Sequence, residues 1–185
     1  MIGFAITGSF CTFSKVFGVL ENLTEEYEIM PIMSEITYKT DTRFGKAEDN
    51  INFLEKTTGK KVIKTIKEAE PIGPKKLFDA LIIAPCTGNT IAKIANGIAD
   101  TSVTLSAKSH LRNKRPVIIA VSTNDGLGNN AKNIGTLLNM KNIYFVPFGQ
   151  DDYVEKENSL VADFDKIPET LEMALNGKQL QPIIL

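Results

Sequence analysis

The stretch LIIAPCTGNTIAKIANGIADT, residues 81–101, decides the fold. Apolar residues lead into the polar loop PCTGNT, which runs directly into a helix-like segment rich in small residues. In α/β proteins, a strand that stops in a short polar loop at a helix start brings backbone N–H groups together where ligands bind. The stretch therefore predicts a strand, loop and helix of a parallel sheet, with a ligand site at the loop.

The same alternation of short apolar runs and helix-length amphipathic segments extends along the chain, which is typical of βαβ units around a buried parallel sheet. We predict strands at residues 2–7, 27–33, 61–66, 80–85, 116–121 and 142–148. We predict helices at residues 12–26, 46–57, 89–97, 102–113, 130–140 and 166–176. Segment 68–76, which contains Pro and Gly, is expected to be a surface connection. The predicted fold class is α/β, a single Rossmann-like (flavodoxin-like) three-layer domain over residues 1–185 with about six parallel strands.

Composition narrows the class of protein. With 185 residues, 43% of them hydrophobic and 23% charged, the chain is long and apolar enough to bury a full core. A formal net charge of -1 disfavours a nucleic-acid binder, which needs a concentrated basic surface. The lone His110 and two distant cysteines do not form a zinc motif. Without a signal-peptide pattern or an apolar run of about 20 residues, we expect a cytoplasmic protein with no membrane segment.

Polar residues follow the first two predicted strands, at the edge of the sheet where ligands bind. Gly8 permits a tight turn after the first strand, and Ser9 offers a hydroxyl and an N–H to a phosphate. Ser34 and Thr37 follow the second strand. Each of these residues is either a phosphate ligand or merely a turn or helix cap.

Two further loops belong to the same predicted edge. In the loop after residue 85, Thr87, Asn89 and Thr90 offer hydroxyl and amide groups, and Gly88 permits close backbone approach. The alternative for this loop is a well-capped helix in a tight core. A loop rich in Asn and Gly begins at Asn124, and its alternative is a flexible connection.

Four segments together resemble a known flavoprotein family, which includes phosphopantothenoylcysteine decarboxylase and the peptidyl-cysteine decarboxylases. They are GSFCTF, PIMS, APCTGNTIAKIANGIADT and VSTNDGLGNNAKNIGTLL. The hallmark of the family is a Pro-Ala-Ser-Ala-Asn-Thr loop followed by a helix that reads like KIANGIAD. Within the family, the resemblance runs over the whole chain to the branch of dipicolinate synthase B subunits from spore-forming bacteria.

The resemblance implies an FMN cofactor. Carried over by position, Gly8, Ser9 and Ser34 would hold the phosphate and ribityl groups, and Asn124 would touch the substrate or the flavin ring. The loop residues that would lie at the flavin are Pro85, Cys86, Thr87, Gly88, Asn89 and Thr90.

Departures from the family pattern limit the activity that the resemblance implies. Cys86 and Gly88 replace alanines, Thr87 replaces a serine, and VSTNDGLGNN lacks the Met and Trp of the decarboxylase substrate loop. Residues 34–84 contain no counterpart of the decarboxylase histidine, and His110 is expected to be a surface or packing residue. We therefore expect flavin binding without decarboxylation by the family mechanism.

The branch implies oxidation of a dihydrodipicolinate-type intermediate to dipicolinate in the mother cell of a sporulating bacterium. It also implies that the partner is a dipicolinate synthase A subunit, with NADP or NAD bound to that partner, and a homo-oligomer that is a trimer or a multiple of trimers. Two alternatives stay open: an FMN-dependent decarboxylase of a cysteine-containing substrate, and a non-catalytic partner of the A subunit.

Charged residues near the predicted edge supply candidates for the chemistry. Arg43, with Lys46, is a candidate ligand for substrate carboxylates, because guanidinium groups bind carboxylates in a bidentate manner. Asp125 is a candidate proton-transfer group. Cys86 is either a reactive thiol or a small buried hydrophobic residue. The alternative for Arg43 and Asp125 is a solvated loop side chain.

Overall fold

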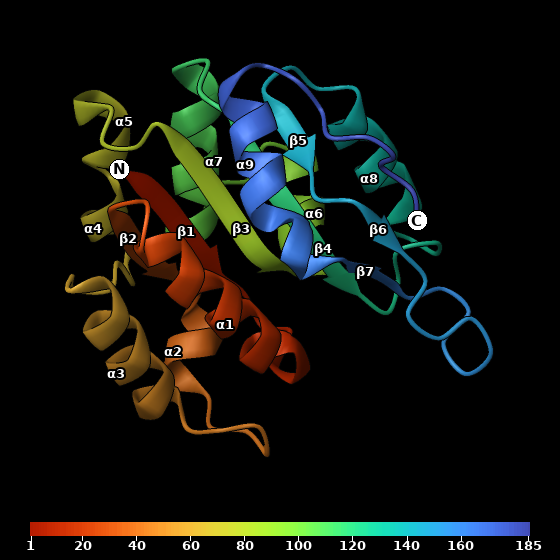
Figure 1. Cartoon of the computed structure of the whole chain (residues 1–185), viewed down its shortest axis with the longest axis horizontal. Helices are drawn as coiled ribbons and strands as arrows, with labels where there is room; N and C mark the ends of the chain where they lie inside the picture. The colour runs from red at the N-terminus through yellow and green to blue at the C-terminus, as the bar shows by residue number, and fades with distance from the viewer.

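A twisted parallel sheet is the centre of the structure (Figure 1). The computed structural model describes residues 1–185, and its parallel strands are β1 (Ile2–Ile6), β2 (Ile29–Met33), β3 (Ala80–Cys86), β4 (Val117–Thr123) and β5 (Ile143–Phe145). They pair in the order β2-β1-β3-β4-β5. This is the flavodoxin-like strand order, in which the chain reverses its direction of winding between β1 and β3.

Two short antiparallel strands extend the sheet at the carboxyl end of β4. β7 (Leu160–Ala162) pairs with Ser122 and Thr123, and β6 (Phe148–Gly149) pairs with β7. Residues 150–159 connect β6 to β7 as a loop that projects from the body of the protein (Figure 1). The sheet thus continues past the point where the parallel strands stop.

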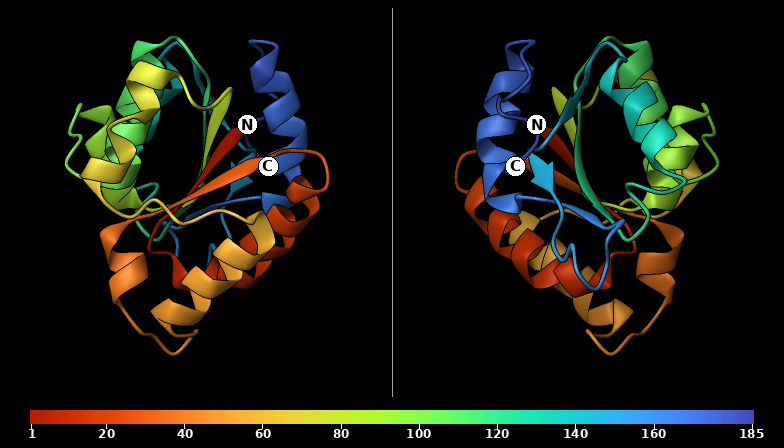
Figure 2. Two further views of the ribbon diagram at one scale, coloured as in Figure 1. Left: turned by 90° about the vertical axis from the view of Figure 1, so that its left-hand side faces the viewer. Right: turned by 90° about the vertical axis from the view of Figure 1, so that its right-hand side faces the viewer.

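Helices cover both faces of the sheet (Figure 2). One layer contains α1 (Phe13–Thr24), α3 (Ala47–Thr58) and α9 (Ile167–Leu175). The other contains α4 (Ile66–Ala69), α5 (Ile72–Lys75), α6 (Gly88–Ala95), α7 (Ser102–Arg112) and α8 (Ala131–Leu138). The short elements are α2 (Glu35–Lys39), η1 (Phe10–Thr12) and η2 (Phe164–Lys166).

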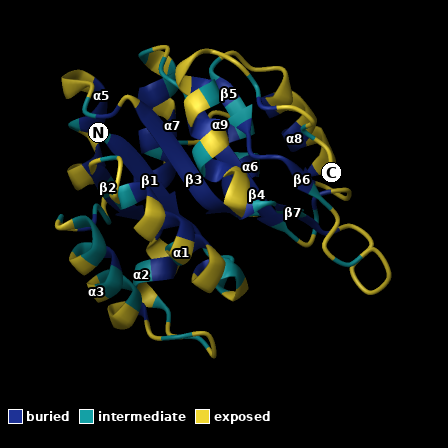
Figure 3. Ribbon diagram, in the orientation of Figure 1, coloured by how far each residue is buried: buried dark blue, intermediate teal, exposed yellow.

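The core lies where the strands meet both helical layers, and its 44 buried residues form one cluster. All residues of β1 and β3 are buried (Figure 3), which explains why these strands read as continuous apolar runs. Gly3 of β1 is required by close packing, because a Cβ there would lie 2.6 Å from the ring of Phe78. No helix of the structure is both long enough and apolar enough to cross a bilayer.

The predicted α/β fold class and all six predicted helices are confirmed, although their ends move by a few residues. Four predicted strands are also confirmed. The predicted strand at residues 142–148 is divided into β5 and β6, and neither β6 nor β7 is long enough to give a periodic signal.

The prediction of a strand at residues 61–66 is wrong. Only Ile63 pairs there, through an isolated bridge to Ile32. Thr65 instead starts α4: its side chain accepts a hydrogen bond from the Glu68 N–H, while Glu68 accepts from the Thr65 N–H. This capping box favours a helix over a continued strand.

The prediction that residues 68–76 form only a surface connection is also wrong. The segment contains the end of α4 and all of α5, and both Ala69 and Ile72 are fully buried. These apolar side chains pack the two short helices against α7. Of the Pro and Gly residues that suggested a loop, Pro71 lies between the two helices, whereas Gly73 and Pro74 lie within α5.

His110 on α7 is a packing residue, as expected. It is 1% exposed, its ring packs against Phe78, and its Nε2 has no hydrogen-bond partner. Burial lowers the pKa of His110 to about 4, with a smaller contribution from the charge of Arg115. The folded protein therefore holds this imidazole neutral, whereas the unfolded chain protonates it near pH 6.5.

We predict that His110 makes the protein acid-labile. Between pH 6.5 and about 4 the unfolded state binds the extra proton, so the free energy of unfolding falls as pH falls through this window, by at most about 3 kcal/mol. His110→Gln should flatten this part of the profile when urea unfolding is measured from pH 7 to 4. Parallel losses of stability in the wild type and the variant would show that another group causes the lability.

Candidate functional site

The carboxyl ends of β1, β2, β3 and β4 meet at one edge of the sheet, and two pockets open there. They share Gly8, which follows β1, and Thr87, which follows β3. The strand order reverses between these two strands, and open α/β sheets bind their ligands in the crevice at this switch point. The pocket volumes, about 790 and 470 Å³, are both typical of small-molecule sites.

Thr7 joins the two strand ends at this edge. Its buried hydroxyl donates to the Pro85 carbonyl at 2.7 Å and accepts from the Thr87 N–H at 2.9 Å. Thr87 in turn caps α6, where its hydroxyl accepts from the Thr90 N–H. These bonds fix the wall that separates the two pockets.

The smaller pocket is rich in hydroxyl, amide and ammonium groups. Its lining residues are Thr7, Gly8, Ser34, Glu35, Ile36, Lys39, Thr40, Thr87, Asn89, Thr90, Lys93 and Thr101. Ser34 is buried within 3.3 Å of the Thr37 hydroxyl, and the Thr37 hydroxyl donates to the Ser34 carbonyl. This donor set suits a phosphate and a polyol chain.

Both lysines of the smaller pocket have carboxylate partners. Lys39 pairs with Glu35 one helical turn away, and Lys93 contacts Asp100 at 2.8 Å. The hydrogen bond from Lys93 holds the pKa of Asp100 below its usual value. A carboxylate therefore balances the charge of each lysine, and the pocket offers a ligand the lysine N–H groups together with its hydroxyl and amide groups.

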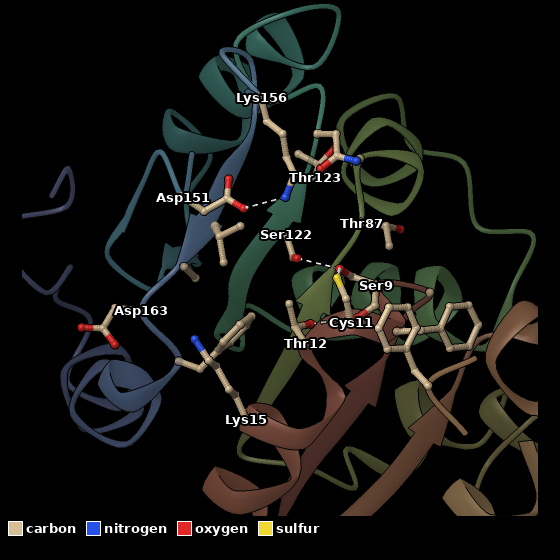
Figure 4. A pocket seen from close by; sticks show the side chains of 18 of the residues that line it. Ser9, Cys11, Thr12, Lys15, Thr87, Ser122, Thr123, Asp151, Lys156 and Asp163 are labelled. Carbon is tan, nitrogen blue, oxygen red and sulfur yellow. Dashed lines mark hydrogen bonds and ion pairs between the residues drawn. The ribbon is translucent and has the colours of Figure 1, made fainter. Parts of the chain in front are cut away.

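The larger pocket lies on the other side of Gly8 and Thr87 and combines polar and aromatic walls (Figure 4). The Ser9 and Ser122 hydroxyls are hydrogen-bonded at 2.7 Å, which joins the β1 loop to the end of β4. Aromatic residues in the lining are Phe10, Phe44 and Phe164, and the charged ones are Lys15, Asp151, Lys156, Asp163 and Asp165. Such a pocket offers apolar surface for a flat ring and charges that orient it.

Gly88 lets the loop after β4 rest on the start of α6. A Cβ on Gly88 would lie 2.5 Å from Nδ2 of Asn130 and 2.6 Å from Oγ1 of Thr123. The loop itself is held by Asp125, whose carboxylate accepts hydrogen bonds from the Asn129 N–H and the Asn130 amide. The close approach therefore shapes one wall of the larger pocket.

Most of the predicted site residues come together around the two pockets. Those that line one or both are Gly8, Ser9, Ser34, Thr87, Gly88, Asn89, Thr90 and Asn124. Pro85 and Cys86 lie within β3, are buried and line neither pocket. Burial raises the pKa of the Cys86 thiol far above its usual range, so this side chain stays protonated and acts as a small core residue.

Three predicted charged residues lie outside the pocket walls. The Arg43 guanidinium lies over the ring of Phe44, 4.8 Å from its centroid, and Lys46 precedes α3. Asp125 is occupied by the hydrogen bonds that hold its own loop. Only Phe44 of the Arg43 loop reaches the larger pocket.

Sequence reasoning missed several pocket residues. Thr7 and Ser122 are polar residues at the ends of apolar strands, a signal that was present in the sequence. Lys15 shows no such signal, because it occupies an exposed position of an amphipathic helix. Asp151 and Lys156 belong to a charged loop whose return to the edge depends on the β6–β7 pairing.

Comparisons with known proteins agree with this architecture. The Flavoprotein family model matches residues 1–174. The chain is 46% identical to the dipicolinate synthase B subunit of Bacillus subtilis (strain 168), over 100% of this chain and 92% of that protein. It superimposes on the crystal structure of the dipicolinate synthase B subunit from Bacillus halodurans C with a TM-score of 0.91 and 44% identity, covering 100% and 95% of the two chains.

A more distant neighbour shares the fold alone. The FMN-dependent cysteine decarboxylase SpaF superimposes with a TM-score of 0.62 and 21% identity, covering 95% of this chain and 94% of that one.

We predict that Gly88→Ala disrupts the contact between the β4 loop and α6. The added methyl group overlaps Asn130 and Thr123, so the free energy of unfolding should fall by about 1–3 kcal/mol. Gly135→Ala is the matched control, because a Cβ there meets no atom within 4 Å on the exposed face of α8. It should raise stability by up to about 1 kcal/mol. Equal urea midpoints for Gly88→Ala and the wild type would contradict the close packing.

Proposed function

Because the chain belongs to the Flavoprotein family, we propose that it binds FMN at the β1/β3 edge and serves as the B subunit of a dipicolinate synthase. The observation that carries this proposal is the 46% identity to a dipicolinate synthase B subunit over the whole chain. The adjoining pockets at the switch point support it independently, because one is rich in hydroxyl groups and contains two lysines, and the other is partly aromatic. FMN has two matching parts, a phosphate with a polyol chain and a flat aromatic ring.

The residues of the smaller pocket fit the phosphate and ribityl parts of FMN. Ser34, Asn89 and Thr90 supply hydroxyl and amide groups, and Lys39 supplies an ammonium group that is also paired with Glu35. A Cβ on Gly8 would lie 3.0 Å from the Ile36 side chain, so a larger residue at position 8 would crowd another residue of the pocket wall. The shared residues Gly8 and Thr87 would bring the flavin ring toward the aromatic wall of the larger pocket.

In the proposed reaction, a dihydrodipicolinate-type substrate loses a hydride and a proton and becomes the aromatic pyridine-2,6-dicarboxylate. Bound FMN supplies a two-electron acceptor for the hydride. Asn124 lines the larger pocket and would contact the substrate, while Asp125 keeps the Asn124 loop in place through Asn129 and Asn130. The walls of the larger pocket would hold the substrate in a fixed orientation. Such positioning contributes a large part of the rate enhancement of an enzymatic hydride transfer.

The remaining parts of the proposal rest on resemblance. The A subunit would bind NADP or NAD, and this chain would assemble as a trimer or a multiple of trimers in the mother cell of a sporulating bacterium. The alternatives are a decarboxylase of a cysteine-containing substrate and a non-catalytic partner of the A subunit. The lack of a histidine in residues 34–84 disfavours the decarboxylase.

A reconstitution experiment separates these functions. The FMN-loaded chain is mixed with the A subunit, a nicotinamide cofactor and a dihydrodipicolinate precursor, and dipicolinate is measured by its ultraviolet absorption. We expect product only when both proteins and FMN are present. Equal product without FMN would favour the non-catalytic partner, and carbon dioxide release from a cysteinyl peptide would favour the decarboxylase.

We predict that Asn89→Leu abolishes FMN retention without unfolding the protein. Asn89 is exposed at the start of α6 and lines the smaller pocket, so the change removes an amide from the site without disturbing the core. The measurement is flavin absorbance per protein after desalting. Asn22→Leu, on an exposed position of α1, is the control and should retain flavin like the wild type. Full retention by Asn89→Leu would remove this loop from the flavin site.

A further inference from the structure

Two ammonium groups enter the larger pocket from elements that are far apart in the sequence. Lys15 belongs to the first turn of α1, and Lys156 belongs to the loop between β6 and β7. Figure 4 shows the two side chains on opposite sides of the pocket, with the Lys156 ammonium group beside Asp151 and the hydrogen-bonded Ser9 and Ser122 to one side. The pocket is therefore positively charged at two separate points.

Lys15 makes no ion pair in the structure, unlike Lys39 and Lys93 of the smaller pocket. Asp151, Asp163 and Asp165 also line this pocket, and none of the three forms an ion pair with Lys15. Asp163 points away from the hollow in Figure 4, and its carboxylate accepts the N–H of Asp165 at the start of η2. An ammonium group without a carboxylate partner on a pocket wall favours an anionic ligand group.

Lys156 has a partner, but a weak one. Its Nζ lies 3.5 Å from Oδ2 of Asp151, and the Lys156 side chain remains 51% exposed. A pair of this length in contact with solvent contributes little, so Lys156 remains able to bind a second carboxylate. Asp151 limits where the Lys156 ammonium group can lie and so acts as a positioning residue.

The space between the lysines suits a flat ring. The Ser9 and Ser122 hydroxyls and Asn124 supply hydrogen-bonding groups, and the aromatic residues of the same lining supply apolar surface. A rigid ring with a carboxylate on each side of its nitrogen directs its two charges apart. Two cations on opposite walls match such a ligand better than a single cluster of positive charge.

We propose that Lys15 and Lys156 form a dicarboxylate subsite, in which each ammonium group binds one carboxylate of an aromatic or dihydroaromatic substrate. The proposal rests on the proposed function, which supplies a substrate of this class. It assigns the carboxylate-binding role, expected from sequence for Arg43 and Lys46, to two residues that line the pocket. The subsite therefore selects dicarboxylates over monocarboxylates.

The test compares the affinities of pyridine-2,6-dicarboxylate and pyridine-2-carboxylate by calorimetry in metal-free buffer. Wild-type protein, with and without FMN, should bind the dicarboxylate at least about tenfold more tightly, which is the effect of one charge-assisted contact. Lys15→Met and Lys156→Met should each reduce this preference to about twofold. Lys15→Arg should retain most of it, and Lys141→Met, an exposed change outside both pockets, should retain all of it.

An unchanged preference in both methionine variants, or no preference in the wild type, would overturn the subsite. Far-ultraviolet circular dichroism establishes that each variant is folded, and retention by Lys15→Arg separates lost charge from lost packing. Flavin retention is measured on the same samples. Lysine-dependent selection in a protein that fails to retain added FMN would leave the subsite standing and refute the proposed FMN site. Retention of FMN without selection would refute the subsite and leave the FMN site standing.

Discussion

The hydroxyl of Thr7 is the contact on which the site depends. Parallel strands end together at one edge, and each leaves backbone groups there that the sheet no longer pairs. The register between β3 and β4 shifts after Ile83, so the end of β3 is irregular where it meets β4. Thr7 compensates from the other side, because its single side chain satisfies the Pro85 carbonyl and the Thr87 N–H. The turn from β3 into α6 is thereby held rigidly between the two pockets.

The two pockets on either side of this wall differ in their chemistry. In the smaller one, both lysines are paired with carboxylates and hydroxyl groups dominate, which suits a ligand that is held permanently. In the larger one, Lys15 is unpaired and the pair of Lys156 with Asp151 is long, which suits a charged substrate that enters and leaves. This difference in neutralisation is the physical basis for proposing a cofactor site in the smaller pocket and a substrate site in the larger one.

Strong local patterns made much of the fold predictable. The apolar runs of β1, β3 and β4 and the amphipathic helices were visible because burial on both faces of the sheet requires them. Residues 61–66 misled the prediction, because their apolar alternation was overridden by the Thr65 capping box. The strands β6 and β7 were missed because pairing of two or three residues depends on tertiary contacts rather than on pattern.

The candidate site was predictable to a similar extent. Polar residues that follow strands, such as Ser34 and Asn89, were found because the carboxyl ends of all parallel strands lie at the same edge of the sheet. The charged residues of the site were not found from the sequence, because neighbouring residues do not indicate where a long side chain points. Arg43 stacks on Phe44 outside the pockets, whereas Lys15 enters one from a helix face that reads as solvent-exposed.

The most direct measurement of the central claim is a comparison of FMN with riboflavin by absorbance and fluorescence titration of the purified protein, followed by desalting. The two ligands share the ring and differ by the phosphate that the smaller pocket is expected to hold. The account predicts that FMN binds one per chain and stays bound, while riboflavin is washed away. Equal retention of both flavins, or of neither, would contradict the assignment of the β1/β3 edge as an FMN site.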